Sequence, residues 1–192
     1  MPEDLRVIKK ALRRDLKAKR EAMGETLRME KSALIVERIK QSEFYKQANK
    51  IFVFNPIGAE LRIDLIFNQA EAEGKILAFP VTFAKGRMEA FVPEDRHKMQ
   101  ADSMGIKSPD PDRDKQLDPQ EIDLLLVPLL GFDRSKQRIG YGGGFYDRFI
   151  ARLSPHSVTI GVAFAEQEVA EIPTGRFDKT LDYIFTDKEI IE

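Results

Sequence analysis

The stretch DLLLVPLLGFDRSKQRIGYGGGFYDRF, residues 123–149, decides the fold of this chain. It opens with an uninterrupted apolar run at residues 124–130, which is typical of a central strand covered on both faces. Four glycines follow within residues 140–144, and the segment from Phe145 to about Leu153 then predicts a helix. A buried strand that leads into a helix is typical of an α/β fold with a parallel sheet.

Helices and strands alternate along the rest of the chain. Helical spacing of apolar residues predicts a helix from Glu3 to about Ala22, a second from about Thr26 to Tyr45, and a third within residues 60–74. Thr26 is the expected N-cap of the second helix, and Gly74 is expected to end the third. Short apolar runs predict further strands at residues 51–54, 75–80, 158–164 and 181–187.

This alternation predicts one domain over residues 1–192, with a three-layer α/β/α fold and a largely parallel, Rossmann-like central sheet. Residues 81–92 predict an added β-hairpin with Lys85 and Gly86 at its tip. Residues 93–120 are rich in Asp and Pro and show no period, which predicts an irregular excursion.

The composition excludes several kinds of site. The 192 residues include no cysteine and two histidines, which excludes disulfides, thiolate zinc sites, cysteine nucleophiles and a histidine-rich metal site. A formal net charge of -1 argues against nucleic acid as a partner, and no apolar stretch approaches the roughly 20 residues of a membrane span. We therefore expect a cytoplasmic protein, monomeric or weakly dimeric, that is not bound to membranes.

The glycine run lies where an open parallel sheet binds ligands, beyond the carboxyl end of the central strand. Backbone N–H groups at the start of the following helix can converge there on an anion, and phosphate is the natural candidate. The alternative is a tight turn in which glycine only permits positive φ. The run matches neither a Walker A loop nor a dinucleotide fingerprint, and it contains no Gly-x-Ser-x-Gly elbow.

Charged side chains near the run have two interpretations each. Arg138 offers a fork of donors to a polyphosphate, or is a solvated loop charge. Asp147 either favours the helix N-terminus or holds Mg²⁺ beside a triphosphate. Lys9 and Arg13 are one turn apart on the first helix, and either clamp phosphates or belong to a solvated basic face that includes Arg20. The apolar stripe beside Lys9 and Arg13 is expected to contain Leu5, Ile8, Leu12 and Leu16.

The run VPLLGFD…RIGYGGGFYDRF, together with KKALRRDL and IPTGRFDKTLDYIFTD, resembles the 5-formyltetrahydrofolate cyclo-ligase family, also called methenyltetrahydrofolate synthetase. The likeness spans nearly the whole chain, and its central motif is long and tightly spaced. It implies conversion of 5-formyltetrahydrofolate to 5,10-methenyltetrahydrofolate, driven by ATP and Mg²⁺, with release of ADP and phosphate. The expected partners are therefore two small-molecule substrates, ATP and the folate.

The resemblance also implies roles for individual residues. Its ATP contacts are Lys9, Lys10, Ala11, Leu12 and Arg13, and then Arg138, Ile139, Gly140, Tyr141, Gly142, Gly143, Gly144, Phe145 and Tyr146. Its folate contacts are Asn55, Glu60, Tyr141, Gly142, Gly143, Gly144 and Phe145. Arg138 and Tyr146 are the expected catalytic residues, and Asp147 and Asp178 the expected Mg²⁺ ligands.

Glu60 suits the pterin edge, because that edge presents N–H donors in an amidine-like array and a carboxylate accepts two of them. Without the resemblance, Glu60 is a charge at a helix start. Four features depart from the family pattern: Phe145 replaces a Tyr, Gly143 stands where some members carry Lys, Ser108 replaces a Glu, and the loop at residues 55–64 has an unusual sequence.

The expected mechanism is phosphorylation of the formyl oxygen followed by ring closure through N10. This chemistry needs positioning and charge stabilisation rather than a covalent nucleophile. Two other functions remain open. Related α/β folds serve sugar-phosphate isomerases and CoA transferases, which do not consume ATP. A non-catalytic nucleotide-binding protein would bind ATP without releasing ADP when folate is added.

Overall fold

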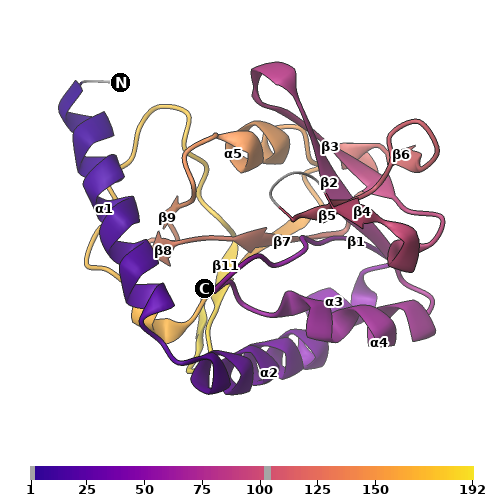
Figure 1. Cartoon of the computed structure of the whole chain (residues 1–192), viewed down its shortest axis with the longest axis horizontal. Coiled ribbons are helices and arrows are strands. Elements are labelled where there is room, and N and C mark those ends of the chain that lie inside the picture. Colours follow the sequence, from indigo (N-terminus) through magenta and orange to yellow (C-terminus); the bar gives the residue numbers. More distant parts are fainter. Residues whose placement is uncertain (1–2, 102–104) are drawn as a thin grey trace.

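Five parallel strands form the middle of the main sheet (Figure 1). The computed structural model describes residues 3–101 and 105–192. The main sheet has eight strands in the order β12-β11-β10-β7-β1-β2-β3-β6. The pairs β11–β12, β2–β3 and β3–β6 are antiparallel, and the other pairs are parallel. The strands are β1 (Lys50–Phe52), β2 (Ile76–Phe83), β3 (Arg87–Val92), β6 (Lys115–Leu117), β7 (Leu124–Pro128), β10 (Val158–Val162), β11 (Tyr183–Phe185) and β12 (Ile190–Ile191).

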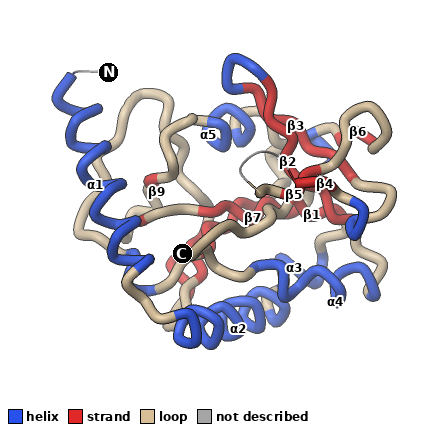
Figure 2. The backbone as a smooth tube through the Cα atoms, in the orientation of Figure 1, coloured by secondary structure: helices blue, strands red, loops and turns tan. Residues whose placement is uncertain are grey.

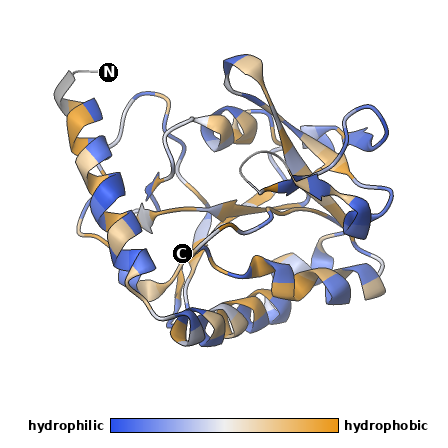
Figure 3. Ribbon diagram, viewed as in Figure 1, coloured by the Kyte–Doolittle hydropathy of each residue, from blue (hydrophilic) through white to orange (hydrophobic). Residues whose placement is uncertain are grey.

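The central strand β7 is the one that the apolar run predicts. It pairs in parallel with β1 on one side and with β10 on the other. Its side chains from Leu124 to Val127 are fully buried, and Figure 3 shows it as a continuous apolar ribbon. The burial follows from the layers, because helices cover both faces of the sheet.

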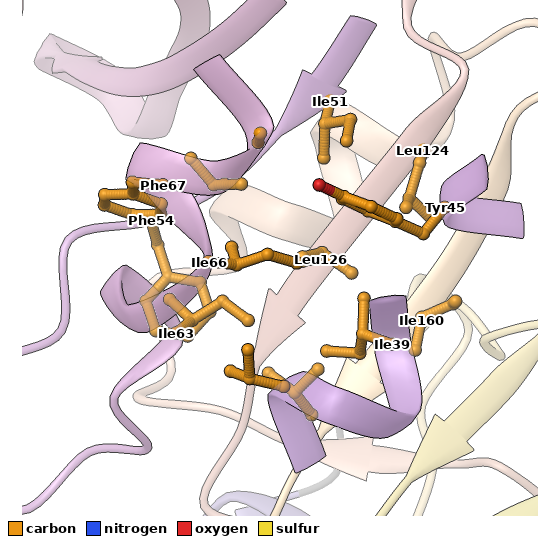
Figure 4. Packing of buried hydrophobic residues seen from close by; sticks show 14 of the residues in the cluster. Ile39, Tyr45, Ile51, Phe54, Ile63, Ile66, Phe67, Leu124, Leu126 and Ile160 are labelled. Carbon is orange, nitrogen blue, oxygen red and sulfur yellow. The ribbon is translucent and has the colours of Figure 1, made fainter. Parts of the chain in front are cut away.

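Helices α2, α3 and α4 lie on one face of the sheet and α5 lies on the other (Figure 2). Their bounds are α2 (Glu25–Gln41), α3 (Glu43–Gln47), α4 (Phe67–Ala72) and α5 (Phe145–Ile150). On the first face, Ile39 and Ile66 pack against Leu126 (Figure 4). On the second face, the rings of Phe52 and Phe149 stack with their centroids 4.7 Å apart. The predicted three-layer α/β/α fold is confirmed.

The second predicted helix begins where expected, but its N-cap and its C-terminal end are wrong. α2 begins at Glu25 after the N-cap Gly24, so Thr26 lies inside the helix and is not its cap. The helix stops short of Tyr45, because Ser42 adopts an extended conformation and its hydroxyl accepts a hydrogen bond from the Tyr45 N–H, which starts α3. A capping residue in the middle of an apolar pattern therefore divides one predicted helix into two.

The third predicted helix is shorter than its apolar spacing indicates. A 3-10 turn, Ile63–Ile66, precedes α4. Gly74 follows the helix with φ 76°, the left-handed conformation expected of a glycine at this position. The helix after the glycine run, α5, likewise ends at Ile150 rather than near Leu153.

The predicted β-hairpin is confirmed as β2 and β3, with its tip at Ala84–Gly86. The separate strand predicted at residues 75–80 is wrong, because it continues into the hairpin as the single strand β2. The excursion at residues 93–120 is more ordered than predicted. Its strand β6 joins the edge of the main sheet, and β4 (Gln100–Ala101) pairs with β5 (Lys107–Ser108). It also contains the 3-10 turns Arg96–Lys98 and Pro119–Glu121. These strands are too short to leave a periodic signal in the sequence.

A small hairpin that the sequence pattern does not predict lies between β7 and the glycine run. Its strands are β8 (Gly131–Phe132) and β9 (Arg138–Ile139). Asp133 holds its turn, because the buried carboxylate accepts the N–H groups of Ser135, Gln137 and Ile172 at 2.8–3.1 Å. The 3-10 turn Ala165–Gln167 packs nearby, where the Gln167 amide donates to the carbonyls of Leu129 and Leu130.

Helix α1 (Glu3–Glu21) lies beside this β8–β9 hairpin (Figure 1). Leu12 and Leu16 pack there with Ile139, as the apolar stripe predicts. Ile8 is wrong as a stripe residue, since it is 52% exposed, whereas Lys9 is 4% exposed. The first half of α1 therefore faces polar loops rather than the core. None of the helices in the described ranges has the length and hydropathy of a membrane-spanning segment.

The sheet topology places the candidate site. Counted along the chain, the five parallel strands have the spatial order 2-1-3-4-5, and the order reverses between β1 and β7. Open α/β sheets bind ligands beyond the carboxyl ends of the strands at such a reversal. The loops that leave β1 and β7 in this chain contain Glu60 and, after the β8–β9 hairpin, the glycine run.

Gly131 lies in β8 and sets how closely α1 approaches the β8–β9 hairpin. A Cβ atom added there would lie 2.5 Å from Leu16 Cδ1 and 3.1 Å from the Gln167 carbonyl oxygen. Gly131→Ala should therefore destabilise the protein by about 1–3 kcal/mol through overpacking. Gly140→Ala is the control, because a Cβ there meets nothing within 4 Å. The midpoint of urea denaturation measures both, and an equal midpoint for the two variants would contradict the packing argument.

Candidate functional site

The glycine-rich loop, residues 140–144, connects β9 to α5. Gly142 has φ 100° and Gly144 has φ 64°, in the left-handed region that only glycine adopts readily. Within the described part of the chain, none of the five backbone N–H groups of this loop donates a hydrogen bond. The loop thus has the positive φ angles of a tight turn. It also has the free N–H donors that an anion-binding loop requires.

One ion pair closes the base of this loop. Arg138, just before the loop, donates from Nη2 to Asp147 Oδ1 in α5 at 2.8 Å. The backbone of Lys179 reinforces the pair, since its carbonyl accepts from Arg138 at 2.5 Å and its N–H donates to Asp147 at 3.0 Å. Arg138 is buried, so its interpretation as a solvated loop charge is wrong.

Helix α1 contributes two cations to the same loop and its surroundings. Lys9 forms an ion pair with Asp178, and Asp178 also accepts the Gly175 N–H at 2.6 Å. Arg13 donates from Nε to the Gly140 carbonyl at 2.9 Å. Its guanidinium lies so close to Gly142 that an added Cβ there would be 3.1 Å from Cζ. Lys9 and Arg13 therefore face the site, as predicted, and not the solvated face.

The two predicted metal ligands lie near each other. Asp178 immediately precedes Lys179, whose backbone contacts Asp147. In each of these carboxylates one oxygen takes all the hydrogen bonds found in the described part of the chain, Oδ1 in Asp147 and Oδ2 in Asp178. The second oxygen of each thus remains available. No group of three or more acidic or histidine side chains that could hold a metal occurs among the described residues.

A chain of hydrogen bonds joins three segments on the other side of the loop. Arg20 of α1 donates to the Tyr141 hydroxyl at 2.7 Å, and this hydroxyl contacts Glu60 Oε1 at 2.5 Å. The second Glu60 oxygen accepts the Ile57 N–H at 3.0 Å. Burial and the adjacent Glu60 carboxylate raise the pKa of Tyr141 to about 12, so its hydroxyl is protonated at neutral pH.

Tyr146 is partly buried against the core on the α5 side of the sheet. Burial, with a smaller contribution from the charge of Glu60, raises the pKa of its hydroxyl, which Arg138 opposes. Its hydroxyl has no hydrogen-bond partner in the part of the chain that the structure describes. Because its pKa is raised, the Tyr146 hydroxyl is a neutral donor at neutral pH.

Arg148 ties the β2–β3 hairpin to the glycine-rich loop. It donates from Nε to the Gly86 carbonyl at 2.9 Å and from Nη2 to the Gly143 carbonyl at 2.5 Å. Its guanidinium also lies over the Phe145 ring, 5.8 Å from the centroid. The added hairpin thus borders the site instead of extending away from it.

Other predicted contacts are not brought into this network. Lys10 and Ala11 are exposed on α1, while Leu12 and Ile139 pack in the small cluster between α1 and the β8–β9 hairpin. Asn55 donates to the Lys107 carbonyl at 2.6 Å and so contacts the excursion at residues 93–120. Their roles in binding stay predictions.

Sequence patterns do not indicate two arginines of the site. The basic pattern of α1 predicts a solvated Arg20, although this side chain is buried. The signal was present, because Lys9, Arg13, Leu16 and Arg20 follow at spacings of four, three and four and so share one helix face. Arg148 carries no such signal, because Gly86 is distant in sequence and both of its partners, Gly86 and Gly143, contribute only backbone carbonyls.

The arrangement is suited to binding a polyanion. Donors converge from the loop backbone, and Lys9, Arg13 and Arg138 surround them, each held at present by a protein oxygen. Phosphate oxygens are ligands that these cations and backbone N–H groups bind. Glu60, beyond the loop, is the carboxylate that can accept N–H groups from a second molecule.

Comparisons with known proteins show the family of this chain. The model of the 5-formyltetrahydrofolate cyclo-ligase family matches residues 6–187. A 5-formyltetrahydrofolate cyclo-ligase of Mus musculus is 27% identical over 186 residues, which is 92% of this chain and 92% of that protein. One from Escherichia coli K12 is 28% identical over 148 residues, covering 76% of this chain and 81% of its own.

A solved structure has the same fold. The 5,10-methenyltetrahydrofolate synthetase of Aquifex aeolicus superimposes with a TM-score of 0.83 at 24% identity, over 95% of this chain and 91% of its own. The likeness in fold covers almost the whole chain.

Proposed function

The chain belongs to the 5-formyltetrahydrofolate cyclo-ligase family, and we propose that it converts 5-formyltetrahydrofolate to 5,10-methenyltetrahydrofolate while ATP becomes ADP and phosphate. The observation that carries the proposal is the glycine-rich loop, whose five N–H groups have no acceptor in the described part of the chain. Lys9, Arg13 and Arg138 border it. Such a site binds a triphosphate.

The reaction needs a leaving group on the formyl carbon. The formyl group on N5 is an amide, so its carbon is a poor electrophile and its oxygen does not depart unaided. Transfer of the γ-phosphoryl group forms a bond from phosphorus to the formyl oxygen and breaks the bond to ADP. N10 then attacks the formyl carbon, the carbon–oxygen bond breaks, phosphate leaves with the electron pair, and the N10 proton passes to solvent.

The residues of the loop stabilise charge during the phosphoryl transfer. The backbone N–H groups and Arg138 are directed at the place where negative charge develops on the γ-phosphate. Lys9 and Arg13 close over the phosphates from α1. Tyr146 is a neutral donor, and we propose that its hydroxyl donates to the formyl oxygen. This oxygen is the atom that leaves the formyl carbon with phosphate.

Glu60 is the folate-binding group in this proposal. Its carboxylate accepts two N–H groups of the pterin, which orients N5 and N10 toward the loop. Asn55 and the glycine-rich loop border the same molecule. The carboxylate is buried and already held by Tyr141 and Ile57, so little ordering is needed when folate binds.

The carboxylates of Asp147 and Asp178 fit Mg²⁺ as an accompanying ion. Each keeps one oxygen without a partner in the described ranges, and Mg²⁺ in proteins prefers one or two carboxylates completed by phosphate oxygens and water. When bound, the ion neutralises charge on the phosphates. A cytoplasmic location and a monomeric or weakly dimeric state stay predictions from the sequence.

The proposal is tested by mixing the purified protein with 5-formyltetrahydrofolate and following the absorbance of methenyltetrahydrofolate. We expect product only when Mg²⁺ and ATP are both present, with one ADP released for each product. ADP release without product would indicate a different ATP-dependent reaction. ATP binding without either change would indicate a nucleotide-binding protein instead.

Arg138→Ala should lower kcat by about 10²–10³-fold, the usual effect of removing one preorganised donor. Arg134→Ala is the matched control on the same hairpin, because Arg134 pairs with Glu168 and Glu189 at the surface and should leave turnover near that of the wild type. Circular dichroism verifies the fold of both. Equal turnover in the two variants would remove Arg138 from the mechanism.

Asp147→Asn should raise the Mg²⁺ concentration needed for half-maximal turnover by about tenfold, because an amide oxygen is a weaker ligand than a carboxylate. Asp15→Asn changes an exposed carboxylate of α1 and serves as the control. Turnover is titrated with Mg²⁺ at saturating ATP. An Mg²⁺ titration that is unchanged in Asp147→Asn would exclude Asp147 as a ligand.

A further inference from the structure

We propose that Arg20 is a positioning residue for the folate-binding carboxylate of Glu60 and that it acts through the hydroxyl of Tyr141. The inference rests on the proposed function, because it takes Glu60 as the group that accepts the pterin N–H donors. Arg20 comes from the last turns of α1, Tyr141 from the glycine-rich loop and Glu60 from the loop after β1. One chain of hydrogen bonds, at 2.7 and 2.5 Å, joins all three.

Arg20 and Glu60 are buried charges of opposite sign that are joined through one hydroxyl. Arg20 is 4% exposed and Glu60 is 6% exposed. Within the described residues no carboxylate touches the Arg20 guanidinium, and its buried Nε has no hydrogen-bond partner. A buried cation without compensation is costly. The nearest compensation is the Glu60 carboxylate, one hydroxyl away, and the Tyr141 ring, whose centroid is 5.9 Å from Arg20 Cζ.

Arg20 also fixes the direction of the hydrogen bonds. A guanidinium only donates, so the Tyr141 oxygen must accept from Arg20. The Tyr141 proton is then directed to Glu60 Oε1, which must be an acceptor. Without Arg20 the hydroxyl is held by Glu60 alone, and the Tyr141 oxygen is open to another donor. Arg20 thus keeps the Tyr141 hydroxyl directed at Glu60 Oε1 as a donor.

This arrangement leaves Glu60 prepared for a ligand with two neighbouring N–H groups. Tyr141 occupies one site on Oε1, and the Ile57 N–H occupies one site on Oε2. A carboxylate has about four acceptor sites, so one remains on each oxygen. Two parallel N–H donors, as on the pterin edge, match the remaining pair. Rotation of the carboxylate would break both internal hydrogen bonds.

The test replaces Arg20 by methionine, which keeps a flexible, unbranched apolar stem and removes the charge and the donors. We expect Arg20→Met to raise the KM for 5-formyltetrahydrofolate by about tenfold, with kcat and the KM for ATP changed by less than about twofold. Arg20→Lys should recover part of the loss, since it keeps a charge and a donor. Lys19→Met is the control, because Lys19 is an exposed cation of the same helix.

A double-mutant cycle separates positioning through Tyr141 from a general structural role. Tyr141→Phe should also raise the KM for the folate, and adding Arg20→Met to Tyr141→Phe should raise it little further. Thermal unfolding of every variant accompanies the kinetics. Because the cycle compares folded enzymes, a loss of stability in Arg20→Met does not imitate the expected coupling.

The outcomes distinguish this inference from the proposed function. The inference alone is overturned if the wild type is active and Arg20→Met leaves the KM for the folate unchanged. It is also overturned if the effects of Arg20→Met and Tyr141→Phe on that KM are additive in the double variant. A parallel rise in the KM for ATP also overturns it, since Arg20 would then act on the whole loop. If the wild type neither turns over 5-formyltetrahydrofolate nor binds it in calorimetry, the proposed function fails and the inference fails with it.

Discussion

The ion pair between Arg138 and Asp147 is the interaction on which the candidate site depends. The two residues stand on either side of the glycine-rich loop, and their contact closes its base while the backbone of Lys179 holds both partners. A loop with several glycines has a high conformational entropy when it is free. The pair removes part of that freedom without occupying the backbone N–H groups, so they remain available to a ligand.

Helix α1 supplies the other half of the site. Its cations reach two loops: Lys9 contacts Asp178, whereas Arg13 and Arg20 contact Gly140 and Tyr141 of the glycine-rich loop. These contacts spread along one helix face, and the close approach of Leu16 to Gly131 holds that face against the sheet. The buried charges are therefore compensated before any phosphate enters. Cations that are already held in place need little further ordering when a ligand binds, which keeps the cost of binding low.

The sequence predicts the central features well, because they depend on strong local signals. The apolar run of β7, the hairpin tip at Gly86 and the helix end at Gly74 each have a distinct pattern, and all three are confirmed. Predictions fail where one polar contact overrides periodicity. Ser42 divides a helix through a single hydrogen bond, and strands of two residues leave no pattern. In the site, the sequence leaves two positions open for Lys9 and Arg13, beside the glycine-rich loop or in solvent. The partners of Arg20 and Arg148 depend on the tertiary fold, so no local pattern indicates them.

The central claim, that the glycine-rich loop holds the triphosphate, is tested most directly by nuclear magnetic resonance of ¹⁵N-labelled protein. A non-hydrolysable ATP analogue with Mg²⁺ is titrated into it, and the backbone amide signals are followed. The account predicts that the signals of residues 140–144 move most, because these N–H groups gain phosphate acceptors. If the analogue binds while those signals stay in place and others move, the triphosphate lies elsewhere and the account is contradicted.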